Sequence, residues 1–332
     1  MHTGQENNAS IDTSLLSIVV QGQVAENLNT VLTSLRRCFP GAEIILSTWE
    51  GSDVTGAECD KIVLSPDPGA VCCDEITGIH NNVNRQLVST KAGLKIAGKP
   101  YILKTRTDII FRDAGFLTFW RKYDALPSRF FQNRILICNY FTRSPRAISL
   151  CFHPSDWLVF GGAEDVRSYY MQTPLMTQTE GGWFSSHPKT STFFTNYLCR
   201  YTPEQYIFIN YLRRHVDVFC ECYYARNREM IILTEQAFAE CFVVLDYQKQ
   251  LNIEFSKYAP NRYKEKYTLF SHRHWRAVYA HYCGKRFSLF WAIYCFQGSV
   301  FSLLTHLRTV CIKILDRLSL KETVKALLRR KL

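Results

Sequence analysis

The segment Tyr101–Ile110 holds the residues best placed for chemistry, because an apolar run ends there in a short polar cluster. Asp108 would follow a buried strand, at the edge where open α/β sheets bind their ligands. Its carboxylate can offer a hard oxygen ligand to Mg²⁺ or Mn²⁺. Lys104 and Arg106 alternate with threonines, so both would lie on one side of the strand. The structural alternative is that Asp108 only caps the segment that follows.

A second polar group, Asn84-Arg85-Gln86, lies in a predicted helix that leads into this strand. The guanidinium of Arg85 can pair with a phosphate group through two hydrogen bonds. Asn84 or Gln86 could contact a ribose or a base. The same residues would equally suit a solvated helix face, which is the usual place for polar side chains.

Two further carboxylates are candidates for catalysis. Asp156 precedes an apolar strand and could bind sugar hydroxyl groups or a metal, and the adjacent Trp157 could stack on a sugar ring. Glu204 follows Pro203 at the start of a predicted helix, where the helix dipole favours a negative charge. A carboxylate there can act as a general base toward an acceptor hydroxyl. The structural alternatives are a strand-start Asp beside a core Trp, and first-turn electrostatics for Glu204.

The elements that would position these residues alternate between strand and helix through residue 110. Strands are predicted at 17–22, 42–49 and 61–65, and another opens at Tyr101. Helices are predicted from their apolar spacing at 26–39 and 81–97. This alternation predicts an α/β fold with a mostly parallel sheet and flanking helices. Because the run around Leu103 is apolar on both faces, its strand should be central.

Beyond residue 110 the pattern is less regular. The predicted elements there are a short helix, two strands and a capped helix, at 114–123, 134–138, 156–161 and 202–214. Residues 230–245 are strongly apolar and could form a strand, a helix, or both in series. The chain is therefore divided into a flexible leader, a main α/β domain and a basic, aromatic helical extension, at 1–14, 15–255 and 256–332.

The 332 residues carry a formal net charge of +11, which favours anionic partners such as nucleotide phosphates or lipid headgroups. Nucleic acid is not expected, because the basic residues are dispersed and no zinc-finger or RNP motif occurs. The 13 cysteines include no C-x-x-C pair, so we expect reduced, mostly buried thiols in a cytosolic protein. Residues 1–12 lack the apolar core of a signal peptide, and no apolar run of spanning length occurs.

The C-terminal region, from Leu303 to Leu332, has apolar residues at helical spacing and a basic complementary face. It follows an aromatic-rich segment at 287–301. Aromatic side chains favour the headgroup region of a bilayer, and basic residues are attracted to an anionic leaflet. We therefore expect this extension to bind an anionic membrane surface without spanning it. The alternative is a helix packed on the main domain with a solvated outer side.

Six sequence blocks carry a resemblance to a known family. They lie in one order along the chain, at 17–24, 44–51, 82–90, 103–108, 155–161 and 203–206. Together they resemble the WavE family of lipopolysaccharide-synthesis proteins, which look like GT-A glycosyltransferases, and the resemblance covers roughly residues 15–250. It implies a GT-A-like fold and transfer of a sugar from a nucleotide-sugar to a lipid-linked or oligosaccharide acceptor. The glycan would be a lipopolysaccharide core, an O-antigen or a capsule.

The resemblance also implies roles for individual residues. The implied donor-binding residues are Gln21, Asn84, Arg85, Lys104, Arg106 and Asp108. Asp108 would be the ligand of a Mg²⁺ or Mn²⁺ ion, but Arg106 stands at the first acidic position of the usual motif and could supply the positive charge itself. Glu204 would be the catalytic carboxylate on the acceptor side, with Asp156 as the competing candidate. The implied location is cytoplasmic, peripheral on the inner face of the inner membrane.

Two other readings of the sequence stay open. A non-catalytic partner that binds nucleotide or glycan during surface polysaccharide assembly would explain why the motif has only one of its two acidic residues. A nucleotidyltransferase or dehydrogenase on a doubly wound sheet is disfavoured. Neither G-x-G-x-x-G nor G-x-x-x-x-G-K-[ST] follows the first predicted strand.

Overall fold

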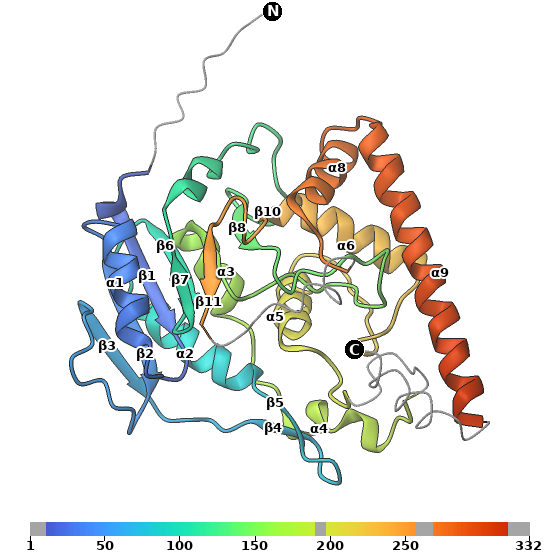
Figure 1. Cartoon of the computed structure of the whole chain (residues 1–332), viewed down its shortest axis with the longest axis horizontal. Helices are drawn as coiled ribbons and strands as arrows, with labels where there is room; N and C mark the ends of the chain where they lie inside the picture. Colours follow the sequence, from blue (N-terminus) through green and yellow to red (C-terminus); the bar gives the residue numbers. More distant parts are fainter. Residues whose placement is uncertain (1–10, 190–196, 257–267, 318–332) are drawn as a thin grey trace, which may run out of the picture.

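The fold is built on a seven-stranded sheet whose central strand is β6, which is labelled in Figure 1. The computed structural model describes residues 11–189, 197–256 and 268–317. The sheet order is β10-β8-β9-β6-β1-β2-β3. Its strands are β1 (Leu16–Gln21), β2 (Glu43–Trp49), β3 (Lys61–Ser65), β6 (Tyr101–Arg106), β8 (Ile135–Cys138), β9 (Val159–Gly162) and β10 (Phe242–Leu245).

The sheet is mostly parallel, as the strand–helix alternation predicts. β1 pairs in parallel with both β2 and β6, β2 pairs in parallel with β3, and β10 pairs in parallel with β8. Only β9 runs antiparallel to its two neighbours among these strands, β6 and β8. The central placement of the strand that contains Leu103 is confirmed, since three strands lie on each side of β6. Leu103 itself is fully buried, consistent with a strand covered on both faces.

Helices cover the sheet, and two small antiparallel strand pairs form separate sheets. The helices are α1 (Leu28–Cys38), α2 (Val83–Ile96), α3 (Ala163–Tyr170), α4 (Gln178–Gly181), α5 (Pro203–Leu212), α6 (Arg228–Cys241), α8 (His272–Tyr282) and α9 (Leu289–Arg317). The small pairs are β4 (Val71–Asp74) with β5 (Ile79–Asn81), and β7 (Ile109–Phe111) with β11 (Ile253–Phe255). Three short 3₁₀ turns are η1 (Thr13–Leu15), η2 (Gly115–Phe119) and η3 (Trp183–Ser185).

The start of α5 is fixed by a reciprocal cap, which matters because Glu204 lies in its first turn. The Thr202 hydroxyl accepts the Gln205 backbone N–H at 3.2 Å, and the Gln205 side-chain oxygen accepts the Thr202 N–H at 3.2 Å. The Gln205 amide also donates to the Cys151 and Tyr223 carbonyls, so the turn is anchored on two sides. The predicted cap and first-turn proline are confirmed.

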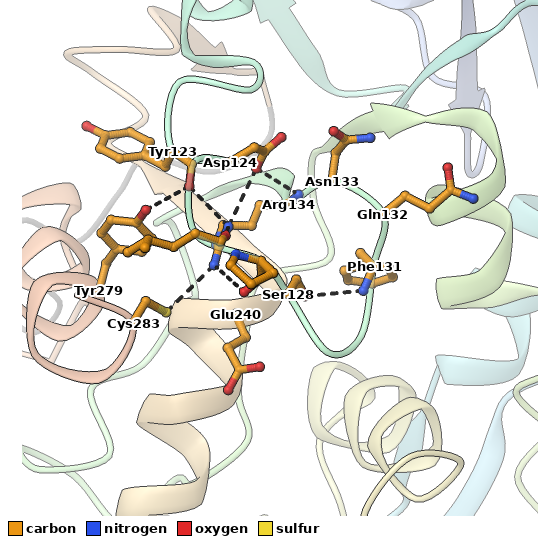
Figure 2. A network of polar contacts seen from close by, with 12 residues as sticks. Tyr123, Asp124, Ser128, Phe131, Gln132, Asn133, Arg134, Glu240, Tyr279 and Cys283 are labelled. Atoms are coloured by element: carbon orange, nitrogen blue, oxygen red, sulfur yellow. Dashed lines mark hydrogen bonds and ion pairs between the residues drawn. The ribbon is translucent and has the colours of Figure 1, made fainter. Parts of the chain in front are cut away.

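A buried arginine joins the C-terminal helices to the sheet (Figure 2). Arg134 directly precedes β8 and is 1 % exposed. Its guanidinium donates to the carbonyls of Ala239 in α6 and of Tyr123, and lies 3.6 Å from an Asp124 oxygen. It also lies over the ring of Tyr279 in α8. Because one cation holds both helices and the loop before β8, the first part of the predicted extension packs as part of the main core.

Several expectations need correction. The helix predicted at 114–123 is the short 3₁₀ turn η2, and α3 and the two small antiparallel pairs were not predicted. Residues 230–245 form both elements in series, α6 and then β10. Cys73 and Cys199 form a disulfide, so the expectation of reduced thiols is wrong for this pair. The two cysteines are 126 positions apart, and only folding brings β4 beside the segment before α5.

Two predictions extend beyond the described residues. The leader lies mostly in residues 1–10, and the last part of the basic tail lies in 318–332, both outside the described ranges. Within the described ranges, no helix combines the length and apolar character that crossing a membrane requires.

The packing of α2 on the sheet depends on a glycine, and this gives a stability prediction. A methyl group at Gly93 would meet the Val19 side chain in β1 at 2.4 Å and that of Ser47 in β2 at 3.3 Å. We expect Gly93→Ala to lower the free energy of unfolding by about 1–3 kcal/mol, measured by urea denaturation, because the added group overpacks this contact. Gly98→Ala is the control, since nothing lies within 4 Å of its added Cβ. Equal stability of the two variants would contradict close packing at Gly93.

Candidate functional site

The carboxyl ends of β1, β2 and β6 open onto one cavity of about 710 Å³. These three strands are parallel, so their last residues meet at the same edge of the sheet. The lining residues are Gln21, Gly22, Gln23, Trp49, Asp67, Asn82, Arg85, Gln86, Arg106, Thr107, Asp108, Phe141, Trp157, Pro203 and Glu204. The cavity is large enough for a nucleotide-sized ligand, and cations, carboxyl groups and aromatic rings share its wall.

The wall at the end of β6 is formed by a paired arginine and aspartate. Arg106 Nε and Nη2 donate to the two carboxylate oxygens of Asp108, each at 2.8 Å. The guanidinium also lies 4.1 Å from the ring centroid of Trp157. Two parallel hydrogen bonds and a stacked ring fix the orientation of the cation. Asp108 is buried, whereas the side chain of Arg106 stays partly open to the cavity.

A second cation, Arg85, lies on the α2 side of the same cavity. Its guanidinium pairs with both Asp67 oxygens at 2.7–3.2 Å and donates to the Asn82 side chain at 3.0 Å. Gln86, the next residue in α2, also lines the cavity, and its buried Oε1 has no hydrogen-bond partner among the described residues.

Asn84 does not line the cavity, although the sequence suggested it for donor binding. Its side-chain amide donates to the Met176 carbonyl at 3.0 Å and accepts the Met176 N–H at 2.7 Å. Residues two apart on a helix lie about 200° apart around its axis, so Asn84 and Gln86 cannot face the same side. Gln86 therefore takes the place in the cavity that Asn84 was expected to hold.

Lys104 and Asp156 lie behind the cavity wall rather than in it. Lys104 is fully buried in β6, its ammonium donates to the Asp156 carbonyl, and it lies 3.9 Å from the Asp156 carboxylate. Burial lowers the pKa of Lys104 to about 8, and the Asp156 charge opposes that shift. Asp156 is 1 % exposed. These two residues therefore form a buried ion pair that cannot touch a ligand in the cavity.

Glu204 also lines the cavity and is the most perturbed carboxyl group there. Burial raises the pKa of Glu204 to about 8, and the negative charge of Asp156 adds to the shift. His153 Nε2 lies 3.7 Å from a Glu204 oxygen, and burial, helped by the Arg143 charge, lowers the pKa of His153 to about 3. Both shifts favour the neutral form of their group, so the Glu204 carboxyl group and the His153 imidazole are both stabilised without charge. Such a carboxyl group can exchange a proton near neutral pH.

The side chains around Asp108 do not by themselves form a metal-binding site. Asp108 is a single carboxylate whose two oxygens are both bonded to Arg106. Across the described residues, no group of three or more His, Cys, Asp or Glu side chains is arranged to hold a metal ion. A divalent cation at Asp108 would have to displace Arg106 and take most of its ligands from another molecule.

The cavity joins most, but not all, of the residues suggested by the sequence. Those that line it are Gln21, Arg85, Arg106, Asp108 and Glu204, and those that do not are Asn84, Lys104 and Asp156. Among the lining residues that sequence reasoning missed, Trp49 ends β2, so the strand-end rule could have found it. Phe141 had no such signal: it lies in an irregular segment with a φ of 68° and stacks on Trp157.

Comparison with known proteins gives one family. The sequence model of a family described as WavE lipopolysaccharide synthesis matches residues 16–307. The match confirms the resemblance and extends it past residue 250, through α8 and much of α9. No curated protein gives a significant match.

The raised pKa of Glu204 predicts a pH-dependent stability difference. The folded chain keeps the Glu204 proton to higher pH than the unfolded chain, so it binds more protons between the ordinary pKa of 4.5 and about 8. Wild-type stability should therefore fall, relative to Glu204→Gln, as pH rises through this window. Urea unfolding of both proteins from pH 5 to pH 8 measures the difference in their free energies of unfolding. The contributions of the other titratable groups cancel in this difference, because both proteins contain them. A stability difference that is flat with pH would show that Glu204 is not held protonated.

Proposed function

Since the chain belongs to the WavE lipopolysaccharide synthesis family, we propose that it is a glycosyltransferase acting in lipopolysaccharide biosynthesis. It would move a sugar from a nucleotide-sugar to a hydroxyl group of a lipopolysaccharide core, O-antigen or capsule glycan. The family membership itself implies the biosynthetic role. The mostly parallel sheet, with one antiparallel strand and a cavity at its carboxyl edge, supports a GT-A-like arrangement.

The observation that carries the proposal is that two guanidinium groups and two indole rings line the same cavity. Arg85 and Arg106 both line it, as do Trp49 and Trp157. Guanidinium groups suit the oxygens of a diphosphate, and an indole ring offers an apolar face to a base or a sugar. A nucleotide-sugar carries all three of these parts. We assign the diphosphate to the Arg85–Arg106 side.

Glu204 is our candidate for the general base on the acceptor side. In the reaction, the acceptor hydroxyl oxygen bonds to the anomeric carbon while the bond from that carbon to the diphosphate oxygen breaks. The hydroxyl proton passes to the Glu204 carboxylate, and the nucleoside diphosphate leaves with the bonding electrons. A base whose pKa lies near the working pH suits this proton transfer. Asp156, the competing candidate, would act through its charge on Glu204.

Arg106 would stabilise the negative charge that develops on the leaving diphosphate. Its fixed orientation against Asp108 and Trp157 supports this role, because a preorganised cation needs no rearrangement as charge develops. If a divalent ion were bound, Asp108 would hold it in place of Arg106, and the ion would supply the positive charge that Arg106 otherwise provides. Addition of Mn²⁺ to the assays below distinguishes the two arrangements.

The alternative is a binding protein that keeps the cavity but has lost turnover. It is favoured by one observation, the bonding of both Asp108 oxygens to Arg106. Such a protein would bind a nucleoside diphosphate and leave a nucleotide-sugar intact in the presence of acceptor.

The first test is binding of nucleoside diphosphates. We expect uridine, guanosine, cytidine or thymidine diphosphate to raise the melting temperature, because a ligand of the native state stabilises it by mass action. Arg85→Ala should weaken binding by about 10- to 100-fold, as expected for loss of hydrogen bonds to a charged group. Arg112→Ala is the matched control, since Arg112 forms a comparable exposed ion pair with Glu254 away from the cavity. If both variants bind like the wild type, the diphosphate does not lie at Arg85.

The second test is catalysis by a Glu204→Gln variant. We expect its turnover to fall by about 10²- to 10⁴-fold, the usual contribution of a general base. Its affinity for the nucleoside diphosphate should be unchanged, because Glu204 lies on the acceptor side. The wild-type rate should rise with pH toward about 8, as the carboxyl ionises, and the variant should lose this dependence. Full activity of the variant would remove Glu204 from the mechanism.

A further inference from the structure

Helix α9 carries a long apolar stripe that faces away from the protein. The helix lies along one edge of the molecule (Figure 1). From Phe296 onward, exposed apolar residues recur every three or four positions or in adjacent pairs. With two residues at the start of the helix they are Leu289, Phe290, Phe296, Val300, Leu303, Leu304, Leu307, Val310 and Ile314. Phe287, just before the helix, is 79 % exposed. A continuous patch of this kind on a folded protein marks an interaction surface.

The opposite side of α9 packs against the core. Trp291 and Tyr294 are buried, and a Cβ at Gly298 would lie 2.4 Å from the Arg146 side chain. Ser302 accepts a hydrogen bond from Arg226 at 3.0 Å. The helix is therefore apolar on two sides, and the sequence from Phe287 to Leu307 contains no Asp, Glu, Lys or Arg. Packing among the described residues explains only one of these sides.

A basic groove runs beside the stripe, between α6 and α9. Two neighbouring cavities of about 520 and 470 Å³ share Arg146 and Arg226 in their walls. The first also includes His306 and Leu303, and the second includes Arg228, which is exposed. Arg146 is ion-paired with the buried Glu235, so the groove's net charge comes from the other basic residues. Cations beside an apolar stripe suit an anionic headgroup above acyl chains.

We propose that α9 lies in the plane of an anionic lipid membrane, with its apolar stripe in the headgroup boundary and the groove against lipid phosphates. The helix has 29 residues, so this contact would be about 43 Å long at 1.5 Å per residue. Phenylalanine and leucine on one face with basic groups beside it are typical of helices that lie in the interface. This contact would bring the protein to the membrane that carries a lipid-linked acceptor. The proposal does not depend on the proposed catalysis.

A second copy of the chain is the competing occupant. Residues 289, 293, 296, 300, 303, 307, 310 and 314 have the alternating four- and three-residue spacing of a two-stranded coiled coil. Two observations favour the membrane. The stripe also includes the flanking Phe290 and Leu304, so it is wider than a coiled-coil seam and lacks the charged pairs that flank one. The formal charge of +11 repels a second copy and attracts an anionic surface.

The test is flotation of the full chain with vesicles of phosphatidylglycerol and phosphatidylcholine, and with phosphatidylcholine alone. We expect the wild type to float with the anionic vesicles and to be released as salt increases. The double variant Phe296→Glu/Leu303→Glu should lose at least nine-tenths of this binding. The matched control is Ile76→Glu/Phe219→Glu, which makes the same charge change at apolar residues that are 95 % and 82 % exposed elsewhere. The control should float like the wild type.

Three results would overturn the proposal. Equal loss of flotation in both double variants would mean that added negative charge alone prevents binding. No flotation of the wild type would exclude an anionic membrane as the occupant. Light scattering without vesicles supplies the third: a wild-type dimer that Phe296→Glu/Leu303→Glu converts to a monomer would assign the stripe to a second copy. Nucleoside diphosphate binding, measured on the same preparations, reports separately on the cavity and shows that each variant is folded.

Discussion

The candidate site depends on one buried charge, the ammonium group of Lys104 in the central strand. An ion inside a sheet is tolerated only if a partner compensates it, because its desolvation costs several kcal/mol. Asp156 is that partner: its carbonyl accepts from the ammonium, and its carboxylate lies 3.9 Å away. The compensation has a consequence for the cavity, since the charge of Asp156 also disfavours ionisation of Glu204. The proton on Glu204 is thus coupled to the ion pair behind it.

Two residues further along β6, a second ion pair serves a different purpose. Arg106 and Asp108 lie at the strand end, where the guanidinium is held by two hydrogen bonds and by the ring of Trp157. Arg106 occupies both oxygens of the carboxylate that a metal would otherwise use, and its own guanidinium is held in one orientation at the cavity. One strand therefore carries a buried lysine that is paired with Asp156 and a partly exposed arginine that suits a phosphate. Burial alone separates these roles.

The C-terminal helices combine core and surface functions. α8 belongs to the core, because Trp275 is fully buried and Arg134 ties the helix to the loop before β8 (Figure 2). The first half of α9 continues this packing through Trp291 and Tyr294. Its outer stripe has no such contact among the described residues. A helix that is apolar on two sides needs two partners, and the part of the chain that the structure describes supplies one.

The sequence alone determined the parts that depend on local order. Apolar periodicity placed β1, α1, β2, α2 and β6, and the continuous apolar run around Leu103 identified the central strand. Strand ends also indicated a site at Arg106 and Asp108, because parallel strands bring their last residues to one edge. The cap at Thr202 placed Glu204 in a first turn. In each case the signal lies within a few residues of the element that it describes.

Only the tertiary structure decided which polar residues face the cavity and in which state. The sequence does not distinguish Asn84 from Gln86 as a cavity residue. The direction in which α2 packs places Gln86 in the cavity wall and turns Asn84 toward Met176. Lys104 and Asp156 became a buried pair because β6 and the chain before β9, 52 positions apart, meet in the sheet. The disulfide between Cys73 and Cys199 and the proton on Glu204 depend on similar long-range contacts. Burial and distance set these properties, and both arise from residues far apart in the chain.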